Sequence, residues 1–357
     1  MDFRAFSEQS GVHAVTVNYK KEESMKTLLV RVLSVLLGLI MSPLVLAQEK
    51  PEKDRIRIGY AAQAAAHSIP YLAKEAGFFS EEGLQVEVVR TAGAIAPMAL
   101  LSGDVDFSIM SAFLMISAAI KEKDLVMLAG LTRYASMSFV SRSEIRSAEG
   151  LRGKVVGLQR PGDAYEMNAR FALRHLGLEP NKDVKFLFLG SNEVIWPALE
   201  GKRVDAAVIT PPATLWARKA RMNFLVELAD LKIEYQGSTL TTRRVLLRDN
   251  PNLTRKVVRA MVRGIHFFKT GREKTQAILS RFLGTKDREA LEETWRYLAD
   301  MPAKPYAVES AVQGVLNHLS ERDARFTQHR PTEFIDNGPL SEVERSGFID
   351  RLYQVAK

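Results

Sequence analysis

Few residues of this 357-residue chain have the types and spacing that catalysis or metal binding requires. Cysteine is absent, which excludes disulfides, thiolate zinc sites, iron–sulfur clusters and cysteine nucleophiles. The six histidines are isolated from one another, with no H-x-x-x-H or H-E-x-x-H pattern, and the G-x-S-x-G motif of serine hydrolases is missing. The sequence therefore predicts no metal, no cofactor and no enzymatic reaction.

One segment has the pattern of a strand that leads through a loop into a helix, which is a common place for a bound ligand. It reads GKVVGLQRPGDAYEMNARFALRHLGL over residues 153–178. Its loop lacks the glycines of G-x-G-x-x-G and the lysine of a P-loop, so it is no phosphate cradle of those kinds. Two interpretations stay open: residues 159–165 form the wall of a ligand site, or they only connect two elements and Asp163 caps the helix.

A second loop, AAQAAAHSIP over residues 61–70, follows the first strand and precedes a helix. Its alanines keep the loop narrow, so that backbone groups can approach a ligand. His67 is then a hydrogen-bond donor to that ligand, helped by Gln63 and Ser68. The alternative is a histidine side chain that is simply solvated.

The remaining candidates come from the rule that open parallel sheets bind ligands beyond the carboxyl ends of their strands. Tyr165 and Trp216 are equally suited to a hydrophobic core, and for Trp216 the core is the favoured interpretation. The full set of expected ligand contacts is Gln63, His67, Ser68, Thr91, Gly93, Ala94, Met110, Ser111, Gln159, Arg160, Asp163, Tyr165, Ser191, Thr210 and Trp216.

Strands and helices that alternate twice along the chain must position these residues. The order β-α-β-α-β begins at residue 55 and again at residue 154, and it predicts two doubly wound, mostly parallel sheets. A short internal repeat supports two similar lobes. ALLSGDVD at residues 99–106 and ALEGKRVD at residues 198–205 fall at equivalent positions of the two β-α-β-α-β units. Two facing lobes of this kind form a cleft.

The C-terminal part is expected to return to the first lobe. A strand is predicted over residues 241–249, followed by helices over 251–270, 272–283, 287–300 and 306–319. Lobe I then comprises residues 52–142 and 243–357, and lobe II comprises residues 143–242. Two chain passages, near Val140–Glu144 and Thr239–Arg243, would join the lobes as a hinge.

The N-terminal residues have the features of an exported protein. Residues 25–47 combine a basic start, a short apolar core and a V-x-A exit before Gln48, which is typical of a secretory signal peptide. A membrane anchor is the alternative, although Pro43 and the shortness of the core disfavour it. No cysteine follows, so no lipid anchor is expected, and residues 1–24 are interpreted as an upstream extension. The mature protein is predicted to be periplasmic.

Several stretches resemble a known family in the expected order. They are IPYLAKEAGFFSEEGLQVEVV (69–89), GLRGKVVGL (150–158), ALEGKRVDAAVITPP (198–212) and NPNLTRKVVRAMVRGIHFFKT (250–270). The chain is similar to the extracytoplasmic substrate-binding proteins of ABC importers, in the nitrate, sulfonate, taurine and thiamine-pyrimidine branch. The resemblance implies a two-lobed, type II-like binding-protein fold. It also implies a monomer that closes on a small molecule and delivers it to permease subunits in the inner membrane.

The ligand is expected to be a small organic molecule with a polar or anionic group. Arg160, or free N–H groups at Ile69 and at Ala164–Tyr165, would contact that group, and Tyr165 would stack on the carbon skeleton. An enzyme of the same fold, acting on a heterocyclic or carboxylate substrate, is the alternative. The fungal enzyme that makes the thiamine pyrimidine is disfavoured, because resemblance to it implies a cysteine-rich segment. A net charge of +8 without an aromatic-interleaved basic stripe disfavours nucleic acid as a partner.

Overall fold

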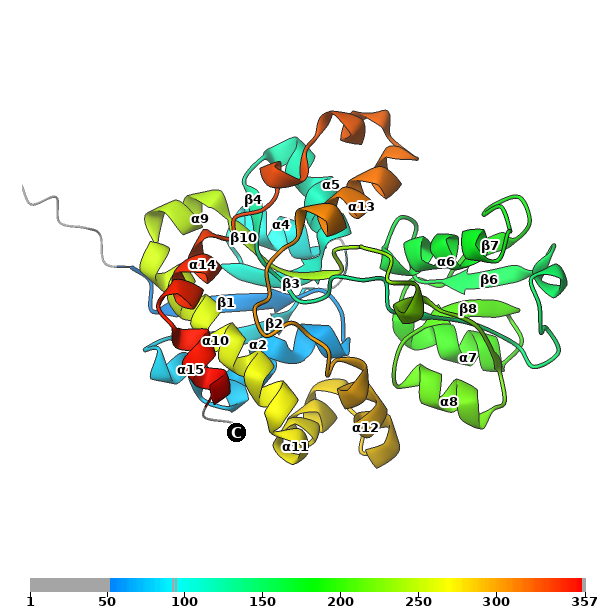
Figure 1. The fold of residues 1–357 in the computed structure, drawn as a ribbon, viewed down its shortest axis with the longest axis horizontal. Helices are drawn as coiled ribbons and strands as arrows, with labels where there is room; N and C mark the ends of the chain where they lie inside the picture. The colour runs from blue at the N-terminus through cyan, green and yellow to red at the C-terminus, as the bar shows by residue number, and fades with distance from the viewer. Residues whose placement is uncertain (1–51, 92, 94, 355–357) are drawn as a thin grey trace, which may run out of the picture. The chain divides into compact units, whose positions relative to one another are not determined.

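The computed structural model describes residues 52–91, 93 and 95–354. The expected extension, the signal peptide and Ala94 lie outside the described residues. Figure 1 shows two sheets, each flanked by helices, with two chain segments passing between them. In the described part of the chain, no helix combines the length and apolar character that a bilayer span needs.

The first sheet has five strands in the order β2-β1-β3-β10-β4. Strands β1 and β2, and β1 and β3, pair in parallel, whereas β10 runs antiparallel between β3 and β4. The free edge of β4 is covered by residues 334–336, because Met127 N–H donates to Phe334 O and Met127 O accepts from Asp336 N–H. The strands are β1 (Arg55–Tyr60), β2 (Gln85–Arg90), β3 (Phe107–Ser111), β4 (Leu125–Gly130) and β10 (Ser238–Arg243).

The second sheet repeats this plan in the order β7-β6-β8-β5-β9. Here β5 runs antiparallel between β8 and β9, while β6 pairs in parallel with β7 and β8. The strands are β5 (Ser138–Ser141), β6 (Val155–Leu158), β7 (Lys185–Phe188), β8 (Ala206–Ile209) and β9 (Asn223–Glu227).

The internal repeat in the sequence is also a repeat in the structure. Asp106 and Asp205, which end the two similar octapeptides, each bind the backbone of the neighbouring parallel strand. Asp106 accepts from Arg57 N–H at 3.0 Å, and Asp205 accepts from Val155 N–H at 2.9 Å. The prediction of two similar α/β units is therefore confirmed.

Helices cover both faces of the first sheet because its strands are apolar on both sides. In β3, Phe107 and Ile109 belong to one core and Met110 to the other, as the period of two in a strand requires. The elements that accompany this sheet are η1 (Ala65–Ser68), α2 (Ile69–Glu75), α3 (Phe78–Glu81), α4 (Ile95–Ser102), α5 (Ala112–Glu122), α9 (Arg244–Asp249), α10 (Pro251–Thr270), α11 (Arg272–Leu283), α12 (Arg288–Tyr297), α13 (Glu309–Ser320), η5 (Ala324–Gln328), η6 (Pro331–Glu333), α14 (Gly338–Arg345) and α15 (Phe348–Gln354).

The second sheet carries shorter helices. The elements that accompany it are η2 (Glu149–Leu151), α6 (Ala164–His175), η3 (Asn192–Val194), α7 (Ile195–Glu200), α8 (Ala213–Lys219) and η4 (Leu228–Leu231). We refer to the first sheet with its helices as lobe I and to the second as lobe II. The C-terminal helices join lobe I, where α10 and α14 contribute buried residues to the same core as β1 and β4.

The two passages between the lobes lie earlier in the chain than the sequence predicts. Strand β5 pairs within the second sheet and β10 within the first, so the crossings are residues 131–137 and 232–237. The boundaries at 142/143 and 242/243 are therefore wrong. Both strands are largely buried, and burial alone does not identify the sheet that a strand joins.

The predicted strand over residues 241–249 is also wrong. It consists of the end of β10 followed by helix α9, which starts at Arg244. The start of α9 is stabilised from a distance, because Asp124 accepts the N–H of Arg244 through its carbonyl and that of Val245 through its carboxylate. This cap comes from more than a hundred residues away and leaves no local signal. The helices predicted at 251–270 and 272–283 are confirmed with those bounds.

Candidate ligand-binding site

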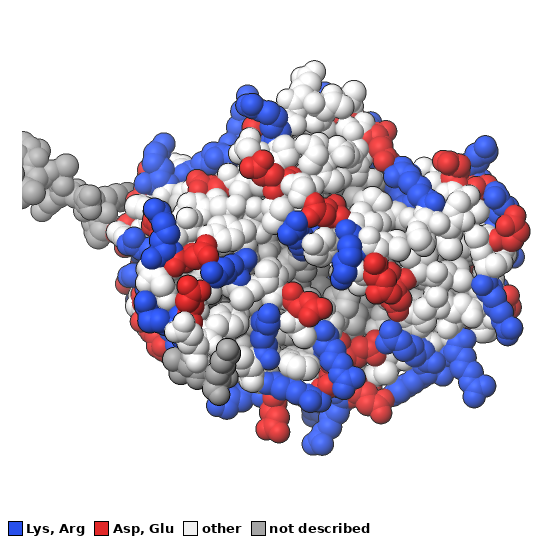
Figure 2. Space-filling model, viewed as in Figure 1, with Lys and Arg blue, Asp and Glu red and all other residues white. Residues whose placement is uncertain are grey.

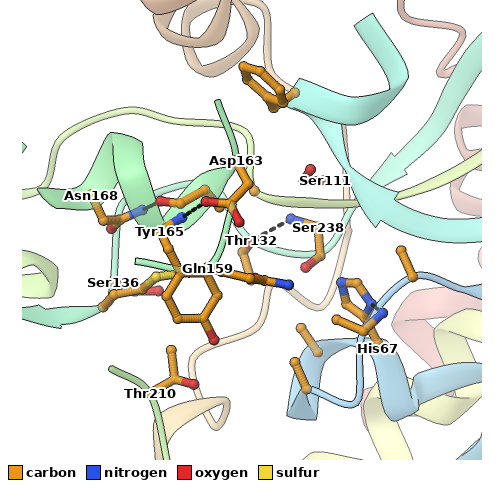
Figure 3. A pocket seen from close by; sticks show the side chains of 18 of the residues that line it. His67, Ser111, Thr132, Ser136, Gln159, Asp163, Tyr165, Asn168, Thr210 and Ser238 are labelled. Carbon is orange, nitrogen blue, oxygen red and sulfur yellow. Dashed lines mark hydrogen bonds between the residues drawn. The ribbon is translucent and has the colours of Figure 1, made fainter. Parts of the chain in front are cut away.

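A cavity of about 240 Å³ lies between the lobes and is lined by residues of both. Lobe I contributes the alanine-rich loop at 61–67 and the start of α5, and lobe II contributes the loop 159–165 and Thr210. The two crossing segments and the end of α12 complete the wall. Figure 3 shows His67 on one side of this space, with Gln159 and Tyr165 on the other.

Eight of the expected ligand contacts line the cavity. The fold brings these residues, from segments far apart in sequence, to one cavity. Their contact with a ligand stays a prediction. The eight residues are His67, Gly93, Ser111, Gln159, Arg160, Asp163, Tyr165 and Thr210.

Six other expected contacts do not line this cavity: Gln63, Ser68, Thr91, Met110, Ser191 and Trp216. Met110 is fully buried in the core, and Ser68 donates its hydroxyl to the Ala65 carbonyl at 2.6 Å. Thr91 is buried against β1. Gln63 and Trp216 line a neighbouring cavity instead.

The sequence analysis missed the residues of the crossing segments that also line the cavity. These are Thr132, Tyr134, Ala135, Ser136 and Met137 in the first crossing and Tyr235 and Gly237 in the second, joined by Ser238 at the start of β10, by Asn168 of α6 and by Tyr297 at the end of α12. The signal was present, because TRYAS (132–136) and YQGS (235–238) combine tyrosine with small hydroxyl residues. These residues are absent from the expected contacts because the sequence predicts the crossings near Val140–Glu144 and Thr239–Arg243 instead.

His67 is held as a neutral hydrogen-bond donor. Ala62 N–H donates to His67 Nδ1 at 3.0 Å, so the ring proton is assigned to Nε2. Burial lowers the pKa of His67 from 6.5 to about 4, and the imidazole is therefore uncharged at neutral pH. The Nε2–H group has no partner among the described residues, which leaves it available to a ligand.

Asp163 is fully engaged with its own loop and helix. One carboxylate oxygen accepts from Tyr165 N–H at 2.9 Å and Glu166 N–H at 3.1 Å, and the other accepts from Arg160 N–H at 3.0 Å. Burial raises the pKa of Asp163 to about 6. The expectation that Tyr165 N–H meets an anionic ligand group is therefore wrong, because Asp163 occupies that donor.

Arg160 spans the rim of the cavity between the lobes. Its Nε donates to the Gly190 carbonyl at 2.8 Å, and its guanidinium lies directly against Gly93 of lobe I. A Cβ atom at Gly93 would be 1.6 Å from the guanidinium, and the backbone there has a φ of +57°. The positive φ favours glycine at this position, and a larger residue would also push the Arg160 guanidinium away from the rim.

Aromatic rings and unpaired polar atoms give the cavity its chemical character. Tyr165 is buried, and its ring points toward Thr210 across the cavity wall (Figure 3). Within the described part of the chain, Tyr235 Oη and Asn168 Oδ1 are buried without a hydrogen-bond partner. Leaving such atoms unpaired costs about 1–3 kcal/mol each, so they are natural contacts for a ligand.

Ion pairs hold the two lobes together on both sides of the cavity. On one side, Arg322 of lobe I contacts Glu166 of α6. On the other, α12 faces α8, where Glu293 accepts from Arg218 at 2.7 Å and Glu289 contacts Lys219. Figure 2 shows charged side chains of both signs along the lower border of this face, where α8 and α12 meet. The lobes are thus connected by ion pairs on both sides of the cavity.

Comparison with known proteins places this geometry in a family. The sequence profile described as "NMT1/THI5 like" matches residues 64–271, which is more than half of the chain. The chain belongs to the NMT1/THI5-like family. A Brucella abortus protein whose name calls it a binding protein is 26% identical over 238 residues, covering 64% of this chain and 71% of that protein.

Solved structures support the same fold for this NMT1/THI5-like protein. The periplasmic aliphatic sulphonate-binding protein SsuA of Escherichia coli has a TM-score of 0.65 and 21% identity, over 79% of this chain and 95% of that one. The desulfurization enzyme DSZB has a TM-score of 0.61 and 15% identity, over 83% and 100%. The expected α/β fold with two lobes is confirmed, and the resemblance noted in the sequence is correct.

The neutral state of His67 predicts how the stability of this family member depends on pH. The unfolded state binds a proton at this side chain below pH 6.5, whereas the folded state does so only near pH 4. Relative to His67→Gln, the wild type should therefore lose roughly 3 kcal/mol of unfolding free energy between pH 7 and pH 4. Urea denaturation of both proteins across this range measures the difference. The pKa of His318 is also lowered to about 4, but His318 is present in both proteins, so its contribution to the pH dependence cancels in the comparison. Parallel pH profiles would show that His67 is not held neutral.

Proposed function

We propose that the protein is the solute-binding component of an ABC import system, which captures a small molecule between its lobes and delivers it to the permease. The observation that carries this proposal is an interlobe cavity lined by residues of both lobes and of both crossings, with polar atoms on His67, Asn168 and Tyr235 that have no partner among the described residues. Family membership and similarity to proteins named as binding proteins support it.

The geometry favours a neutral, planar ligand over an anion. Arg160 and Asp163 bear the charges of the cavity wall, and each is engaged by backbone groups. The rest of the wall combines the neutral imidazole of His67 with aromatic rings and small residues. A ligand that accepts a hydrogen bond from His67 Nε2–H, donates one to Asn168 Oδ1 and packs its ring against Tyr165 would provide the hydrogen-bond partners that these groups lack.

An enzyme is the second candidate, because DSZB shares the fold. Nucleophilic catalysis needs a base within hydrogen-bond reach of a hydroxyl or thiol. Among the described residues, His67 makes no hydrogen bond to a serine, threonine or carboxylate, and its Nδ1 is occupied by Ala62 N–H. No cluster of potential metal ligands occurs in the same part of the chain. These observations favour binding without turnover.

The same proposal includes the cellular setting. The protein would be periplasmic and monomeric, would partner permease subunits of the inner membrane, and would not bind nucleic acid. Similarity to periplasmic binding proteins supports this setting. Cleavage of the signal peptide after Ala47, without a lipid anchor, remains a prediction for residues outside the described part.

Native mass spectrometry of the freshly purified protein tests the function directly. We expect one small molecule bound per chain, released unchanged on denaturation and still unchanged after prolonged incubation with the protein. Small-angle scattering should show a larger radius of gyration after the ligand is removed, because the lobes then separate. Conversion of the released molecule to a product would favour the enzyme. An identical radius with and without ligand would argue against lobe closure.

A further inference from the structure

A second cavity of about 380 Å³ adjoins the first one. The two share Tyr165, Thr210 and Pro211 as lining residues, so they meet at this junction. The second cavity, here called the tryptophan chamber, extends between the end of α11 in lobe I and helices α7 and α8 in lobe II. It also receives Gln63 and Trp216, two residues that the sequence predicts as ligand contacts.

The walls of the tryptophan chamber are apolar and aromatic. Trp196 and Trp216 form a tilted pair with ring centroids 6.2 Å apart. Ile195, Ile209 and Leu283 add aliphatic surface. An uncharged hydrocarbon or aryl group is therefore the chemistry that this space would take.

Two of the polar side chains around the chamber are already paired. Gln63 Nε2 donates to the Phe282 carbonyl at 2.6 Å, and Glu193 at the rim forms an ion pair with Arg90 at 3.2 Å. Since Arg90 ends β2 of lobe I and Glu193 belongs to η3 of lobe II, this pair bridges the lobes beside the chamber. Closure thus encloses the chamber together with the first cavity.

Volume indicates that one ligand occupies both spaces. Small-molecule sites in proteins usually measure ~300–1,000 Å³. The first cavity alone is smaller than this range, whereas the two cavities together fall within it. A third cavity also adjoins the first, at Ser136, Pro211 and Tyr297, but its walls are crowded with charged side chains. The hydrogen bond of 2.8 Å between Ser136 and Tyr297 separates it from the first cavity.

We propose that the solute is a two-part molecule, with a compact polar head in the 240 Å³ cavity and an apolar or aryl substituent in the tryptophan chamber. This inference rests on the proposed binding function and deepens it. The head is oriented by His67 and Asn168, and the substituent gains its binding energy from burial against the indole pair. Molecules with the head alone would then bind weakly.

Benzamide and 4-phenylbenzamide test the inference, because they share a neutral, planar, polar head and differ by one aryl ring. Titration calorimetry should show the larger probe binding roughly tenfold to a hundredfold more tightly to the wild type. The larger probe, and not benzamide, should also change the fluorescence of the tryptophans. Ala213, the first residue of α8, lines the chamber and is partly exposed. In Ala213→Leu the added side chain narrows the chamber where the second ring would lie, so the affinity ratio between the probes should fall toward one.

The control is Ala277→Leu, the same substitution at an exposed position of α11 outside the chamber, which should retain the wild-type ratio. If benzamide binds but the second ring adds nothing, or Ala213→Leu retains the gain, the chamber is not a subsite and the proposed function is unaffected. If neither probe binds the wild type, the neutral planar head is wrong as well. In that case both this inference and the proposed ligand class fail.

Discussion

Glu166→Gln is expected to lower the free energy of unfolding by about 3 kcal/mol, which is a large effect for a single polar substitution. The Glu166 side chain is 0% exposed and accepts from Gly162 N–H at 2.6 Å and from Arg170 at 2.6 and 2.9 Å. Arg322 of lobe I also contacts it. Although burial raises the pKa of Glu166, the Gly162 N–H and the two guanidiniums hold it below its usual value. Removing the charge leaves the buried Arg170 guanidinium without its counterion.

The same substitution should also weaken closure, because Glu166 joins α6 to lobe I through Arg322. Urea denaturation measures the stability, and small-angle scattering measures the fraction of closed molecules. Glu321→Gln is the matched control, since Glu321 pairs with Arg174 at an exposed site and is expected to contribute at most about 1 kcal/mol. Equal losses in the two variants would mean that the buried cluster does not stabilise the protein beyond an ordinary surface pair.

Tyr235→Phe is expected to weaken ligand binding roughly tenfold while leaving the ligand-free protein as stable as the wild type, or slightly more so. The hydroxyl of Tyr235 is buried at the cavity wall and has no partner among the described residues. In the ligand-free protein its removal therefore breaks no hydrogen bond. In the complex it removes one bond to the ligand.

Tyr353→Phe provides a control of the same chemistry far from the site. Tyr353 lies on α15, and its hydroxyl is also buried without a partner among the described residues. Titration calorimetry with the co-purified ligand should show a loss for Tyr235→Phe and no change for Tyr353→Phe. If both variants bind equally well, Tyr235 only packs at the cavity wall and the ligand uses other groups.

Features that depend on neighbouring residues could be predicted from the amino-acid sequence. Pro251 and Gly271 bound a helix with one apolar face, and α10 spans residues 251–270 as expected. Asp163 precedes an amphipathic segment and caps α6 through its own side chain, as the simpler interpretation of the loop holds. The repeated octapeptides, which both end in Val-Asp, indicated two equivalent units, because each aspartate binds the backbone of the strand beside it.

Which segments meet at the site depends on long-range packing and could not be predicted in this way. Strands β5 (SFVS) and β10 (STLTTR) are short and contain few apolar residues, and their pairing partners are chosen by hydrogen bonds and packing across the whole chain. As a result, the crossings at 131–137 and 232–237, with their tyrosines, could not be placed in the cavity wall. The contact between Ser136 and Tyr297 joins residues 161 positions apart, and the tryptophan chamber needs helices from both lobes. Such contacts depend on the packing of distant segments, and no local pattern encodes them.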